Sequence, residues 1–104
     1  MKITLNGMIF TVLLLSKEDF PEPDAMGVYD MDNNTITILN TGSLENKQRL
    51  LAHELCHFLI RHIYHVVDPE KEEAMVALME EGLWSLLAHN TGFFSEFNGR
   101  VGNE

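Results

Sequence analysis

The chain has 104 residues, of which 45% are apolar and 22% are charged. This length accommodates one domain, 1–104, and this composition is typical of a globular rather than a disordered protein. Acidic residues outnumber basic residues by 16 to 7, which gives a formal net charge of −9. Because such a protein repels phosphate backbones and anionic lipid, we expect no nucleic-acid partner and no membrane partner.

The cysteine count and the apolar segments bear on the cellular compartment. One cysteine cannot form an intramolecular disulfide, which favours a reducing compartment. The longest apolar run near the start, 8–15, is too short to span a bilayer. The polar residues 16–19 that follow it offer no small-residue cleavage site of the kind that ends a signal peptide. We therefore predict a cytoplasmic protein.

Two pairs of apolar segments, each pair separated by a turn sequence, predict two β-hairpins: 3–5 with 8–15, and 28–31 with 35–39. The first turn is Asn6-Gly7, a pair that suits a tight type I′ turn. In the last segment Ile36 and Ile38 alternate with threonines, which is the period of a half-buried strand. We therefore expect a small antiparallel sheet.

Two long helices are predicted after the sheet. Ser43 is a favourable N-cap for a helix over 44–64. Asp68 followed by Pro69 is a capping residue followed by proline at the first helical position, and it predicts a second helix that ends at about residue 89. Strands followed by helices predict an α+β fold, with the sheet packed on the two helices.

The end of the chain carries a stop signal for the second helix. Asn90-Thr91-Gly92 combines residues that favour the end of a helix. The Gly-containing tail 98–104 is expected to fray.

Residues 53–57 read His-Glu-Leu-Cys-His, the pattern H-E-x-x-H. On a helix His53 and His57 lie on one face one turn apart, so their imidazoles can hold one metal ion. Glu54 lies about 100° around the helix, where it reaches a metal-bound water rather than the metal. Zinc lowers the pKa of its bound water toward about 7, and Glu54 can take the proton. The alternative is that two histidines are four residues apart by chance.

A catalytic zinc ion needs a third protein ligand, and the second helix offers several glutamates. Helical phase places Glu72 in the middle of the apolar stripe of that helix and Glu73 on its margin. Because a carboxylate aimed at the core is costly unless it is paired or bound to a metal, we predict Glu72 as the third ligand. Glu73 is the alternative, and a helix that starts one turn later would leave Glu72 in solvent.

The motif 53–57, followed by Glu72-Glu73 and an apolar helix, resembles the minimal gluzincin-type domains of phage and mobile-element proteins, which are related to the ImmA/IrrE family of metallopeptidases. The resemblance also includes the upstream hairpin and covers roughly 27–90. It implies that His53, His57 and Glu72 bind Zn²⁺ and that Glu54 is the catalytic base. The family usually shows Glu-x-x-Ala-Asn on the ligand helix, whereas 72–76 read Glu-Glu-Ala-Met-Val, so the choice between Glu72 and Glu73 stays open.

The function that we predict is a zinc-dependent metallopeptidase that hydrolyses peptide bonds of a peptide or protein substrate. We expect the strand Thr35–Leu39 to be a sheet edge that holds an extended peptide as an added strand. The first alternative is a non-catalytic, zinc-stabilised protein-interaction domain. A second alternative is an interaction module that has lost its metal. The sequence does not indicate an oligomeric state.

Overall fold

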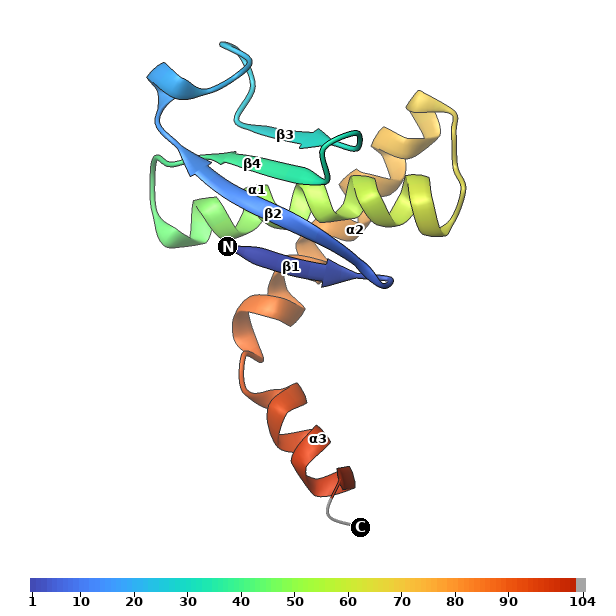
Figure 1. The fold of residues 1–104 in the computed structure, drawn as a ribbon. Coiled ribbons are helices and arrows are strands. Elements are labelled where there is room, and N and C mark those ends of the chain that lie inside the picture. The colour runs from blue at the N-terminus through green and yellow to red at the C-terminus, as the bar shows by residue number, and fades with distance from the viewer. Residues whose placement is uncertain (103–104) are drawn as a thin grey trace.

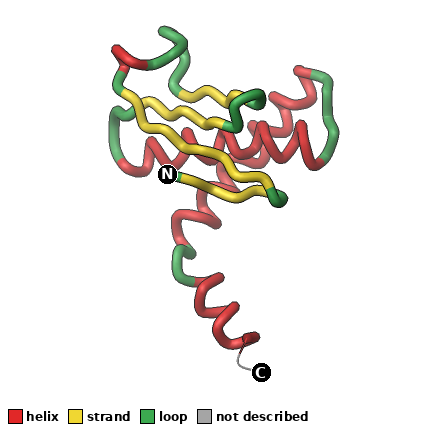
Figure 2. Tube along the Cα trace, viewed as in Figure 1, coloured by secondary structure: helices red, strands yellow, loops and turns green. Residues whose placement is uncertain are grey.

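The computed structural model describes residues 1–102, which form one four-stranded sheet, three α-helices and a short 3-10 helix over Lys17–Asp19 (Figure 1). Figure 2 shows the sheet and the long helices as separate layers. In chain order the elements are β1 (Lys2–Leu5), β2 (Met8–Leu15), β3 (Gly27–Asp30), β4 (Thr35–Leu39), α1 (Leu44–Phe58), α2 (Pro69–His89) and α3 (Phe93–Gly102). The α+β class predicted from the sequence is confirmed.

Both predicted hairpins are present. β1 pairs antiparallel with β2, and β3 pairs antiparallel with β4. The first turn places Asn6 at φ 50° and Gly7 at φ 79°, so both central residues adopt the left-handed conformation that the Asn-Gly pair tolerates.

The prediction of a purely antiparallel sheet is wrong. The strand order is β1-β2-β4-β3, and β2 runs parallel to β4, which makes the sheet mixed. The physical reason is the apolar character of β4, whose Ile36 and Ile38 are 0% and 1% exposed. A strand this apolar takes a central position, and β3 turns back into it from the edge. β4 is therefore not the edge strand that we expected; β3 is.

The core lies between the sheet and α1. Val12, Ile36 and Ile38 from the sheet pack with Leu55 of α1 in one buried cluster. A second cluster joins the two long helices through residues that are fully or almost fully buried: Cys56, Ile60 and Val76. These two clusters fix α1 against the sheet on one side and against α2 on the other.

The predicted helix starts are confirmed by their caps. The Ser43 side chain accepts a hydrogen bond from the Asn46 backbone N–H at 3.1 Å, and the Asp68 side chain accepts one from Glu70 at 3.0 Å. After Phe58 the first helix continues through a π-helical turn over Leu59–Ile63, in which Tyr64 N–H donates to the Leu59 carbonyl at 3.1 Å. The continuous helical segment therefore covers 44–63, close to the expected 44–64.

The chain leaves α2 at Asn90, as the stop signal predicts, and then forms α3, a helix that we did not expect. Residues 98–102 of the tail expected to fray lie in α3, and 103–104 lie outside the described residues, so fraying stays a prediction. Within residues 1–102, none of the helices combines the length and the apolar character needed to cross a bilayer.

Candidate metal centre

His53 and His57 turn the same ring atom toward each other. Their Nε2 atoms are 3.3 Å apart, and the two rings meet edge to face. Two nitrogens bound to one tetrahedral zinc ion at ~2.0–2.1 Å are about 3.3–3.4 Å apart. The separation observed between the two imidazoles therefore fits a shared ion, as the motif predicts.

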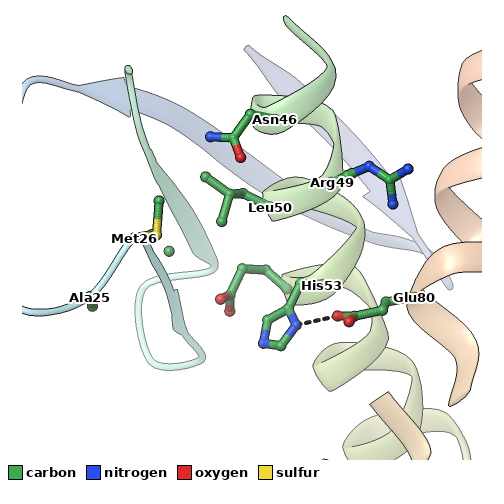
Figure 3. Close-up of a pocket in the computed structure, with 9 residues that line it drawn as sticks. Ala25, Met26, Asn46, Arg49, Leu50, His53 and Glu80 are labelled. Carbon is green, nitrogen blue, oxygen red and sulfur yellow. Dashed lines mark hydrogen bonds and ion pairs between the residues drawn. The ribbon is translucent and has the colours of Figure 1, made fainter. Parts of the chain in front are cut away.

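The opposite ring atom of each histidine contacts a carboxylate of α2. His57 Nδ1 lies 2.7 Å from Glu72 Oε2. His53 Nδ1 lies 2.6 Å from Glu80 Oε2, as the dashed line in Figure 3 shows. A carboxylate at Nδ1 favours the tautomer in which Nδ1 carries the proton and Nε2 carries the lone pair. Two lone pairs that face each other at 3.3 Å repel unless a proton or a cation lies between them. The arrangement therefore suits a cation at the two Nε2 atoms.

Glu72 is 5% exposed, so the burial expected from helical phase is confirmed. Its carboxylate accepts two hydrogen bonds from Arg61, from Nε at 3.0 Å and from Nη2 at 2.8 Å. These bonds to the guanidinium hold the pKa of Glu72 below its ordinary value. The carboxylate therefore lies on the Nδ1 side of His57 and is already paired. Its role as a zinc ligand stays a prediction.

Glu73 lies on the other side of the His57 ring. Its Oε1 is 3.6 Å from His57 Nε2, and its side chain is 66% exposed. His57, Glu72 and Glu73 each offer one ligand atom within 4.8 Å of the other two, and His53 adjoins this group through His57. Because an exposed glutamate changes rotamer at little cost, Glu73 is able to close on an ion held by the two Nε2 atoms.

Glu54 is a largely buried acid near His53 and His57. Its side chain belongs to a residue that is only 7% exposed, and among the described residues the structure shows no hydrogen bond to its carboxylate. Burial raises the pKa of Glu54, and the nearby His57 and His53 oppose that rise. A carboxylate in this state is more basic than one in water.

Two hollows meet at Glu54. One, of about 380 Å³, lies between the loop before β3 and the first turns of α1, where Met26 faces Asn46 and Leu50 (Figure 3). The other, of about 320 Å³, runs along β3 past Tyr29 and His57. Both hollows are lined by His53 and Glu54, so the buried acid borders both.

Cys56, inside the motif, does not face these hollows. It is fully buried and packs with Ile60 and Val76 between the helices. Burial raises the pKa of its thiol to about 11, so the thiol stays protonated at neutral pH. Cys56 therefore serves as a small buried apolar residue.

In the sequence analysis Glu80 was only one of the several glutamates of the second helix that could supply the third ligand, and Arg61 was missed. Both residues could have been linked to the site by their spacing in the sequence from Glu72 and His57. Glu80 follows Glu72 by eight residues, which places it about 80° away on the helical wheel. Arg61 follows His57 by four residues and shares its face of the helix.

Comparison of the chain with protein-family models, with curated proteins and with solved structures finds no match. The likeness to domains related to the ImmA/IrrE family therefore stays a prediction from the motif.

Proposed function

We propose that the protein is a zinc-dependent peptidase whose ion is held by Nε2 of His53, by Nε2 of His57 and by the carboxylate of Glu73. The observation that supports this most directly is the 3.3 Å separation of the two Nε2 atoms, with each Nδ1 tied to a carboxylate. In this proposal Glu72 and Glu80 orient the two rings. The choice of Glu73 over Glu72 follows from the side of the His57 ring on which each carboxylate lies.

Zinc, when bound, would supply a Lewis acid that acidifies a water molecule and polarises the scissile carbonyl. Glu54 takes the proton from the attacking water and returns it to the departing amine. Its burial beside the histidines and its raised pKa support this role, because a general base works best when its pKa approaches the working pH.

The substrate strand in this proposal lies along β3 rather than along Thr35–Leu39. β3 is one of the two edge strands of the sheet, and Gly27, Val28 and Tyr29 line the hollow that His53 and Glu54 also line. A peptide added to that edge would gain main-chain hydrogen bonds and would pass the carboxylate of Glu54. The partner is accordingly an extended peptide or an extended segment of a protein.

The test combines metal analysis with a hydrolysis assay. Protein purified without chelator is analysed for zinc, and its activity is measured on a quenched fluorogenic peptide library with and without 1,10-phenanthroline. We expect about one zinc ion per chain, because the site offers one set of three protein ligands. We also expect that Glu54→Gln retains zinc and loses about 10²–10⁴-fold in rate. The matched control is Glu70→Gln, a residue on the exposed first turn of α2.

Two other results would contradict the peptidase proposal in different ways. Zinc-loaded wild type that cleaves no member of the library would favour the non-catalytic, zinc-stabilised interaction domain. Protein that folds normally and binds no zinc would favour an interaction module without metal.

A further inference from the structure

Gly27, the first residue of β3, faces the carboxylate of Glu54. A Cβ built on Gly27 would lie 2.8 Å from Oε1 of Glu54, 3.2 Å from its Cγ and 3.3 Å from its Cδ. The first distance is shorter than real Cβ contacts, and the other two are tighter than nearly all of them. Any side chain at position 27 would therefore collide with Glu54 in its present place.

The strand itself does not need glycine at this position. The glycines with positive φ in the described chain are Gly7 and Gly42, so Gly27 adopts a backbone conformation that other residues share. Glycine also weakens a strand, because it offers no side chain to pack and loses more conformational freedom on folding. The close approach of Glu54 gives a physical reason for glycine where the backbone gives none.

Neither backbone is free to retreat from the contact. Gly27 is paired with Ile38 in the sheet, and the carbonyl of Met26 accepts a hydrogen bond from Leu39 N–H at 2.8 Å. α1 is held by Leu55, which lies in the buried cluster beneath the sheet. A larger residue at position 27 would therefore displace the side chain of Glu54 rather than either backbone.

We infer that Gly27 is a positioning residue for Glu54. Because Gly27 has no side chain, the carboxylate of Glu54 can stay buried beside His53. Glu54 has no hydrogen bond among the described residues, and its carboxylate occupies the space that a Cβ on Gly27 would need. Gly27 also lines both hollows that meet at Glu54, so a side chain there would stand between them. The catalytic meaning of this inference rests on the proposed function, whereas the contact does not.

The first experiment measures Gly27→Ala on the best-cleaved peptide of the library. We expect kcat to fall on the order of 10²-fold, because a base displaced by about 1 Å loses that much, while zinc content stays near wild type. Any change in KM would report the added methyl group in the substrate hollow rather than the displaced base. The matched control is Gly82→Ala on α2, whose added Cβ would meet nothing within 4 Å. That substitution should raise the melting temperature through helix propensity and leave kcat unchanged. An unchanged kcat in Gly27→Ala would overturn the positioning role.

The second experiment needs no activity. Thermal unfolding of the chelated protein is measured for Gly27→Ala in the wild-type background and in the Glu54→Ala background, which removes the atoms that the new methyl group would meet. We expect the two shifts in melting temperature to differ by several degrees, because residues in contact are not additive. Equal shifts would overturn the contact. If wild type cleaves no peptide and the shifts still differ, the peptidase proposal fails and the placement of Glu54 by Gly27 is supported.

Discussion

His53 and His57 bring their Nε2 atoms within 3.3 Å of each other, and each ring is held from behind by a carboxylate of α2. The two carboxylates belong to Glu80 and Glu72. The helix that the sequence analysis treated as the source of one ligand therefore also fixes the orientation of both rings. Because the glutamates of α2 have different roles in this site, substituting each of them should change zinc binding in a different way.

Glu80→Gln should weaken zinc binding without preventing it. The substitution removes the charge behind His53 Nδ1, and loss of such an outer carboxylate typically costs about 10–100-fold in metal affinity. Competition with a chromophoric chelator measures the affinity. Glu70→Gln removes the same charge from the same helix at an exposed position whose carboxylate makes no hydrogen bond or ion pair with the described residues, so it should bind zinc like wild type. Equal affinities for the two variants would contradict the orienting role of Glu80.

Glu73→Gln and Glu72→Gln should leave the bound metal ion with different sets of protein ligands. We expect cobalt-substituted Glu73→Gln to show a changed visible absorption spectrum, because a carboxylate is lost from the set of donor atoms. Cobalt-substituted Glu72→Gln should keep the wild-type spectrum and bind the ion more weakly, since Glu72 contacts His57 Nδ1. The reverse pattern would assign the third ligand to Glu72, as the resemblance to the metallopeptidase family implies.

The pairing of Glu72 with Arg61 predicts how stability depends on acid. The guanidinium lowers the pKa of Glu72 in the folded protein below the unfolded value of about 4.3. The contribution of the ionised Glu72 carboxylate to stability is therefore complete above a pH of about 4.3. It is lost as the pH falls through the lowered pKa of Glu72 in the folded protein. In chelated protein, Glu72→Gln should lower the free energy of unfolding by about 1–3 kcal/mol at pH 6. Urea titrations at pH 6 and at pH 3 measure this difference, which should shrink at the lower pH.

The effect of Glu54 on folding stability should depend on pH in the opposite direction to that of Glu72. Burial raises its pKa in the folded protein, so ionisation of Glu54 opposes folding as the pH rises from the unfolded pKa to the raised folded pKa. In chelated protein, Glu54→Gln should therefore increase the free energy of unfolding at pH 7, with a smaller difference at pH 3. The same urea titrations serve as the measurement. A variant that is less stable than wild type at pH 7 would show that the carboxylate has a partner in the fold.

Local signals predicted most of the secondary structure. Asn6-Gly7, the caps Ser43 and Asp68, and the alternation around Ile36 each act within a few residues, and the elements that they predict are all present. The parallel pairing of β2 with β4 depends instead on contacts between distant segments, so a pattern within either strand does not reveal it. The third helix, α3, follows a correctly placed stop signal, which marks the end of α2 but carries no information about what comes next.

The candidate site was predicted only in part, because local spacing indicated some of its residues, whereas others depend on contacts between distant segments. The spacing of the motif placed His53 and His57 on one face, and helical phase predicted the burial of Glu72. Phase alone did not tell on which side of the His57 ring that carboxylate would lie, because this depends on how α2 crosses α1. Gly27 could not be linked to Glu54 from the sequence, since the contact joins a strand to a helix 27 residues later.

The spacing of the two carboxylates allows only one alignment of the long helices. The backbone positions of Glu72 and Glu80 are about 12 Å apart along α2, and those of His57 and His53, which they contact, are about 6 Å apart along α1. Slippage of α2 by one turn, about 5.4 Å, would bring Val76 or Trp84 to the place of Glu80. Neither residue offers an acceptor to an imidazole. The two histidine–carboxylate contacts therefore act together with the buried cluster of Cys56, Ile60 and Val76 to set the position of α2 along α1.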